Sequence, residues 1–109
     1  MSDRLTKLNS LLQQEISTFF LNELPHVFVT ITRVEVSPDL HQAIVWVSFL
    51  DKQGSQLQEL RSHLKELRRR LGQRLRLKNV PNLQLQLDRG IEYSEHISEV
   101  IQTIHKEQP

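Results

Sequence analysis

The sequence predicts an α+β domain in which helices cover one face of a three-stranded sheet, and three observations support this prediction. Apolar residues recur every three or four positions over residues 5–20 and 57–75, which is the period of a helix. Over residues 27–50 and 83–87 apolar and polar residues alternate, which is the period of a strand. Residues 94–105 return to helical spacing. The predicted order is helix, strand, strand, one helix or two, strand and a short final helix.

The length and composition fit a single domain over residues 1–109, with 38% hydrophobic and 25% charged residues. The absence of cysteine excludes disulfides and thiolate metal sites. No apolar run approaches the roughly 18 to 20 residues of a membrane span, and the amino terminus lacks the apolar core of a signal peptide. We therefore expect a cytoplasmic protein that does not bind membranes. Residues 106–109 are expected to be a frayed tail.

The first helix is predicted over residues 2–22, with Ser2 or Asp3 as its cap and Pro25 beyond its end. Arg4 and Lys7 lie early on its exposed side, where they serve either solubility or contact with an RNA backbone. The apolar side of this helix consists of Leu5, Leu8, Leu12, Ile16, Phe19 and Phe20.

Two strands are predicted next, joined by a turn at residues 37–39 and therefore antiparallel. The first begins at Val27, and its apolar phase shifts near Arg33, which predicts a bulge. The second spans residues 42–50. It contains Trp46, which we interpret as a core residue rather than as a platform for base stacking, because tryptophan in an apolar strand is more often buried.

A basic helix is predicted over residues 57–78, about 33 Å long if straight and unbroken. Residues 61–78 hold eight of the fourteen Lys and Arg residues and one acid, Glu66, so the rest of the chain carries six bases and twelve acids. These bases form one side of the helix, which we call the basic flank. It is either a solvated surface or a surface that binds anions. Its arginine content and its lack of acids one turn away favour phosphate contacts. The leucines that form its apolar stripe are Leu57, Leu60, Leu64, Leu67, Leu71 and Leu75.

Gly72 lies within this helix and costs about 1 kcal/mol relative to alanine. The simplest interpretation is a tolerated glycine, and the alternatives are a kink or a close backbone approach. Residues 79–82 end the helix, a half-buried strand continues from Leu83 to Asp88, and the final helix is expected over residues 94–105.

No catalytic or metal-binding constellation is visible. The five histidines form no H-x-x-x-H pair, and glycine-rich nucleotide-binding motifs are absent. His41 beside Asp39 is the best acid–base candidate, yet this pairing is commonplace in turns. We expect no enzymatic activity, no cofactor, no metal and no small-molecule substrate.

Two motifs resemble the signature of the bacterial ribosome-binding factor A family. The first is Val29-Thr30-Ile31-Thr32-Arg33-Val34-Glu35-Val36-Ser37-Pro38-Asp39-Leu40, followed by Ala43, Val45 and Val47-Ser48. The second is Leu75-Arg76-Leu77-Lys78-Asn79-Val80-Pro81-Asn82-Leu83, with Asp88 five positions later. The opening helix and the last helix also fit, so the resemblance covers nearly the whole chain.

The resemblance implies a type II KH-like fold and a non-enzymatic factor for late assembly of the small ribosomal subunit. Such a factor binds free 30S particles, supports maturation of the 16S rRNA 5′ end, and is linked to growth in the cold. In this family an Ala-x-Gly kink separates two helices. The matching residues His63-Leu64-Lys65 contain neither alanine nor glycine. We therefore expect this helix to run straighter or to bend nearer Gly72.

We predict that the basic helix binds 16S rRNA of the 30S subunit, with the protein acting as a monomer. Changing Arg68, Arg69 and Arg76 to Glu is expected to leave the fold intact and abolish 30S association. The rival hypothesis is a protein-interaction domain whose arginine-rich helix docks an acidic partner, with a hydrolase or nuclease a distant third. The predicted RNA-binding residues are Arg61, Lys65, Arg68, Arg69 and Arg76, followed by Arg74, Lys78 and Arg4.

Overall fold

A computed structural model describes residues 3–50 and 54–88 of the chain. The elements are α1 (Asp3–Glu23), β1 (Val29–Val36), β2 (Gln42–Phe49), α2 (Gly54–Arg61), α3 (Leu64–Leu75) and β3 (Asn82–Leu87). The predicted order of helices and strands up to residue 88 is confirmed, and two helices, α2 and α3, stand between β2 and β3. The final helix predicted over residues 94–105 and the tail lie outside the described residues.

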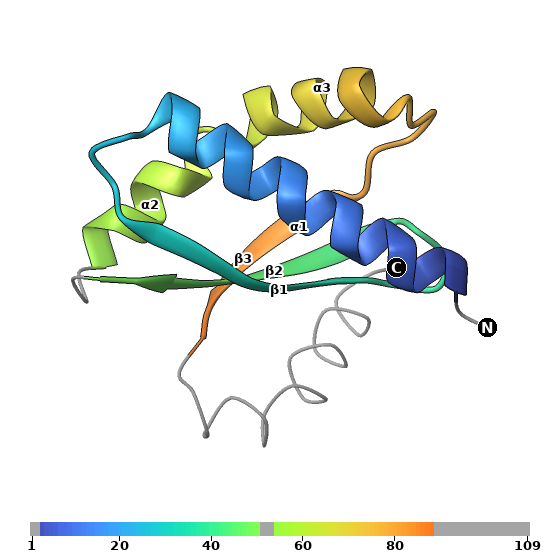
Figure 1. The fold of residues 1–109 in the computed structure, drawn as a ribbon, viewed down its shortest axis with the longest axis horizontal. Helices are drawn as coiled ribbons and strands as arrows, with labels where there is room; N and C mark the ends of the chain where they lie inside the picture. The colour runs from blue at the N-terminus through green and yellow to red at the C-terminus, as the bar shows by residue number, and fades with distance from the viewer. Residues whose placement is uncertain (1–2, 51–53, 89–109) are drawn as a thin grey trace.

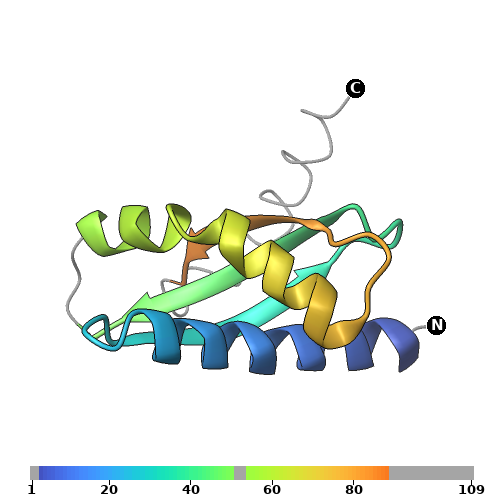
Figure 2. The ribbon, with the colours of Figure 1, turned by 90° about the horizontal axis from the view of Figure 1, so that it is seen from above.

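The three strands form one mixed sheet in the order β1-β2-β3, with β1 antiparallel and β3 parallel to the central strand β2. The register shifts between Ile31 and Arg33, where the change of apolar phase predicted a bulge. The helices lie on one face of the sheet, where α1 runs alongside β1 (Figures 1 and 2). This arrangement agrees with the α+β class predicted from the sequence and with the KH-like fold that the resemblance implies.

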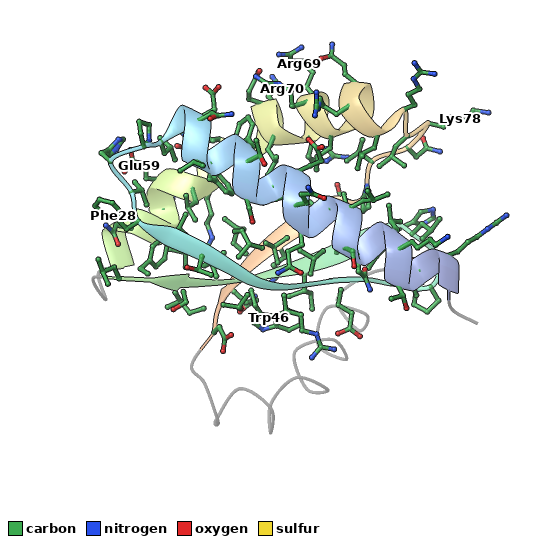
Figure 3. The ribbon with its side chains drawn as sticks, in the orientation of Figure 1. Phe28, Trp46, Glu59, Arg69, Arg70 and Lys78 are labelled. Carbon is green, nitrogen blue, oxygen red and sulfur yellow. The ribbon has the colours of Figure 1, made fainter. Side chains whose placement is uncertain are left out.

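The core lies between the helices and this face of the sheet. Phe19 and Phe20 of α1 are buried and their rings meet edge to face, with centroids 5.4 Å apart. The leucine stripe also faces the core: Leu60, Leu67 and Leu71 are fully buried, and the other three leucines pack against them at partial burial. Trp46, 1% exposed, lies on the opposite face of the sheet (Figure 3), so its interpretation as a buried residue is confirmed.

Side chains of α1 also protect the outer edge of β1, which has no neighbouring strand in the described sheet. The Gln13 amide donates to the Ile31 carbonyl at 2.9 Å, and the Val36 N–H donates to Asn9 Oδ1 at 3.0 Å. Unpaired strand edges invite pairing with other chains, and these bonds block two of the positions where that could occur.

The prediction of one helix over residues 57–78 is wrong, because the chain forms two helices that are separated at Ser62 and His63. The Ser62 hydroxyl donates to the Glu59 carbonyl at 2.7 Å, and His63 Nδ1 lies 3.1 Å from the same oxygen. Side chains that bond to the preceding turn compete with helical hydrogen bonds and so help to end α2. The separation thus includes His63, the first of the residues that match the family's kink, so the expectation of a straighter helix or a bend nearer Gly72 is wrong.

Gly72 instead allows a close approach between α3 and the chain that leads to β3. A Cβ atom added there would lie 3.3 Å from Val80 Cγ2, tighter than ordinary van der Waals contact. The Gly72 carbonyl also accepts the Leu77 N–H at 3.2 Å, which closes the end of the helix. Arg76 takes a left-handed conformation at this point, with φ of 54°. The segment 76–81, which we call the α3–β3 loop, is therefore held tightly against α3.

Candidate nucleic-acid interface

The predicted basic flank divides into arginines that are bound within the molecule and cations that are not. Figure 3 shows Arg69 and Arg70 pointing away from the sheet on α3, and Lys78 pointing outward from the α3–β3 loop. Their surroundings differ. Which cations can meet a phosphate therefore depends on what each side chain already contacts.

Two of the predicted RNA-binding arginines bond to backbone carbonyls. Arg68 is half-buried and donates from Nη2 to the Val80 carbonyl at 2.8 Å and from Nε to the Pro81 carbonyl at 3.2 Å. Arg61 Nη2 donates to the Leu85 carbonyl of β3 at 3.4 Å. Arg68 thus fastens the α3–β3 loop to α3. The expectation that charge reversal at Arg68 leaves the fold unaffected does not agree with this role.

Two further predicted arginines pair with carboxylates on the molecular surface. Arg74 donates from Nε and Nη2 to the two carboxylate oxygens of Glu15 in α1, at 3.1 and 3.3 Å. Arg69 forms a bidentate pair with Glu66, one turn earlier in α3. The hydrogen bond from Arg69 holds the pKa of Glu66 below its usual range, and the pairs with Glu66 and Glu15 raise the pKa values of Arg69 and Arg74. The Arg69–Glu66 pair is therefore charged at neutral pH.

Arg70, which borders the leucine stripe, is also engaged with α1. Its Nη2 lies 3.7 Å from Glu23 Oε2, and its guanidinium carbon lies 5.6 Å from the centroid of the Phe19 ring. Together with the Arg74–Glu15 pair, this contact sets α1 and α3 side by side in opposite directions (Figure 1). The carboxylates of α1 therefore neutralise part of the positive charge of α3.

The remaining predicted residues are exposed cations, and none has a hydrogen bond or ion pair with another residue in the ranges 3–50 and 54–88. They are Arg4, Lys65, Arg76 and Lys78. Lys7 is likewise exposed and has no hydrogen bond or ion pair within those ranges. The sequence placed Lys7 beside Arg4, and their spacing of three residues puts both on one side of α1. The predicted set of RNA-binding residues contains Arg4 and omits Lys7. The spacing of the two residues is the sequence signal that could have identified Lys7 as well.

Four of these cations gather at one end of the molecule. Figures 1 and 2 both place the amino terminus of α1, the turn between β1 and β2, and the α3–β3 loop at this end. The Asn82 N–H donates to the His41 carbonyl at 2.9 Å and ties the β1–β2 turn to the chain just after the loop. We call this surface the basic end, and its cations are Arg4, Lys7, Arg76 and Lys78. Lys65 lies at the start of α3, about 16 Å from Arg76 along the helix.

The basic end can bind an extended polyanion, because its cations come from two segments and are free to turn toward phosphates. The dipole of α1 adds positive potential at its amino terminus. Nothing in the described part of the chain suggests a metal centre, since no group of three histidine or acidic side chains could hold an ion there. None of the helices it contains is long and apolar enough to cross a membrane.

Comparison with known proteins adds independent information. Residues 4–101 match the family model of ribosome-binding factor A. The Opitutus terrae ribosome-binding factor A is 35% identical over 114 residues, which cover 100% of this chain and 93% of the relative. The factor of Thermomicrobium roseum is 34% identical, with 97% of this chain and 87% of the relative covered.

Solved structures are similar as well. The crystal structure of ribosome-binding factor A from Thermus thermophilus matches with a TM-score of 0.68 at 21% identity, covering 76% of this chain and 94% of that one. A solution structure of a Thermotoga maritima candidate for the same factor matches with a TM-score of 0.67 at 29% identity, covering 84% and 93%. The fold is thus the KH-like one expected from the resemblance. The family match over 98 residues, together with relatives above 30% identity along nearly their whole length, shows that this chain belongs to the ribosome-binding factor A family.

Proposed function

We propose that this protein is a non-enzymatic assembly factor that binds the 30S ribosomal subunit by contacting 16S rRNA through its basic end. Membership of the family supports the role. A homology model of the Thermus thermophilus factor has been fitted into a cryo-EM map of its complex with the 30S subunit, and it matches this chain with a TM-score of 0.64 at 24% identity. We choose the basic end as the binding surface because four exposed cations gather there, and none of them has a partner in the described chain.

The mechanism is electrostatic and conformational. Lys and Arg side chains that meet phosphates release condensed counterions, which makes binding strong at low salt and largely independent of base sequence. Specificity then comes from the shape of folded rRNA and from exposed single-stranded segments. The physiological role within the proposal is late maturation of the small subunit, including processing of the 16S rRNA 5′ end and growth in the cold.

The salt dependence of binding tests this proposal. With four phosphate contacts, each contributing about 0.7 to 0.9 to the slope of log affinity against log salt, a fourfold rise in salt should weaken binding roughly 50- to 150-fold. Co-sedimentation of the protein with purified 30S subunits measures this. An acidic protein partner would also give a salt dependence, so binding to subunits treated with RNase separates the two. Binding that survives removal of the rRNA would contradict the proposal.

Freeing Arg74 from its carboxylate partner should tighten binding. In the variant Glu15→Gln, the guanidinium loses its bidentate partner and the surface gains one positive charge. We expect a severalfold higher affinity for 30S subunits and a salt slope steeper by about 0.7 to 0.9. Titration with labelled protein at two salt concentrations measures both quantities.

The matched control for this variant is Glu59→Gln. It changes the net charge equally, but Glu59 pairs with His26 at 2.8 Å and belongs to α2, away from the basic end (Figure 3). Its affinity should change little. Equal gains in both variants would show that net charge matters and that the position of Arg74 does not.

A further inference from the structure

The turn between β1 and β2 presents an apolar side chain in an unusual conformation. Leu40 has φ of 66°, and 46% of its surface is exposed. The left-handed region is sterically unfavourable for residues with a Cβ and is normally filled by glycine or asparagine. Within the described residues, the only other non-glycine residue with positive φ is Arg76, at the same end of the molecule. Neither position needs a leucine or an arginine for its backbone conformation.

Hydrogen bonds hold this turn in place. The Leu40 N–H donates to the Ser37 carbonyl at 2.9 Å, and the Ser37 N–H donates to the Gln42 carbonyl at 2.8 Å. The Asp39 carboxylate accepts from the Ser37 hydroxyl at 2.6 Å and from the His41 N–H at 3.1 Å. None of these bonds uses the leucine side chain. The turn would form equally well with a small polar residue at position 40, so its fold does not explain the exposed leucine.

The surroundings of Leu40 are those of the basic end. The His41 carbonyl accepts the Asn82 N–H, and the last residue of β1 bonds to Asn9 of α1, so the turn lies beside both segments that carry the cations. Asp39 is the only acidic residue in the segments 37–41 and 76–81, and its carboxylate is engaged inside the turn, while α1 begins with one further acidic residue, Asp3. An apolar side chain is thus presented next to four exposed cations.

We propose that Leu40 is a contact residue of the basic end that packs against the sugar or base faces of the bound rRNA, between phosphates held by the cations. This inference rests on the proposed function. An RNA partner is favoured over an acidic protein because ribose and base faces offer apolar surface directly beside phosphates, matching the arrangement of leucine and cations here. Conformational strain kept at an exposed position is typical of functional sites.

The test is the variant Leu40→Asn, which keeps the side chain compatible with a left-handed backbone. We expect its thermal unfolding midpoint to stay the same or rise, because the substitution relieves strain. Its affinity for 30S subunits should fall about fivefold to tenfold through loss of apolar contact. The salt slope should not change, because no charge is removed. The control Leu21→Gln removes a leucine that is 70% exposed near the other end of α1, and its affinity should equal that of the wild type.

A photocrosslinking residue at position 40, in the variant Leu40→p-benzoylphenylalanine, identifies what the position contacts on the subunit. Crosslinks to 16S rRNA are expected, and crosslinks to ribosomal proteins alone would overturn the assignment of RNA. Unchanged affinity of Leu40→Asn, while variants of the cations lose binding, would overturn this inference and leave the proposed function standing. Failure of the wild-type protein to bind 30S subunits would overturn the proposed function itself.

Discussion

Neutralising the basic end with Arg4→Gln, Lys7→Gln, Arg76→Asn and Lys78→Gln is expected to weaken binding to 30S subunits roughly 10³-fold at about 0.1 M salt. Four lost phosphate contacts remove a counterion-release contribution of this size, and the salt slope should become shallower by about 3. Asparagine replaces Arg76 because it readily takes the left-handed conformation observed there. Co-sedimentation or fluorescence titration at several salt concentrations measures both effects.

The fold should survive this change. The four side chains are exposed and bond to no other residue in the part of the chain that the structure describes, so the thermal unfolding midpoint should stay near that of the wild type. Circular dichroism during heating verifies this point before any loss of binding is interpreted.

A comparison at equal charge tests which cations matter. The double variant Arg76→Asn with Lys78→Gln and the double variant Arg69→Gln with Arg74→Gln each remove two positive charges. The second pair is already bound to Glu66 and Glu15, so it should affect binding less. A larger loss from the Arg69 and Arg74 variant would move the interface from the basic end to the exposed side of α3, as the helical pattern first predicted.

The sequence predicted the elements well where hydrophobic period decides the structure. The β-bulge near Arg33 and the burial of the leucine stripe both follow from patterns that local residues impose. The separation of α2 from α3 was not predictable in this way. Leu60, Leu64 and Leu67 keep helical spacing across it, and the break involves hydrogen bonds from Ser62 and His63 that leave the apolar pattern unchanged.

The partition of the basic residues depends on contacts between elements distant in sequence. A helical projection shows which side of α3 carries arginine, but it does not show that Glu15, 59 residues before Arg74, faces it from α1. Nor does it reveal the carbonyl partners of Arg68, which follow only from the path of the α3–β3 loop. Part of the predicted flank therefore has a structural role. Only a minority of the predicted RNA-binding residues are exposed cations of the basic end.

Arg68→Ala is expected to destabilise the protein by about 3 kcal/mol, the largest stability effect of any charged residue discussed above. Arg68 donates two hydrogen bonds from a half-buried guanidinium to the Val80 and Pro81 carbonyls, and bonds from a charged donor contribute about 1.5 to 3 kcal/mol each, less where water can replace them. For a domain of this size, the thermal midpoint should fall by roughly 10 to 20 °C.

The same loss should appear in urea unfolding as a lower midpoint with an unchanged slope, since the folded state buries the same surface. The control is Arg69→Ala, one residue along α3, which removes an exposed guanidinium paired only with Glu66 among the described residues and should unfold close to the wild type. Equal midpoints for the two variants would show that Arg68 does not hold the loop. If Arg68 does hold the α3–β3 loop, an Arg68 variant loses binding because Arg76 and Lys78 are displaced. Arg68 then contributes to rRNA binding by positioning these two cations.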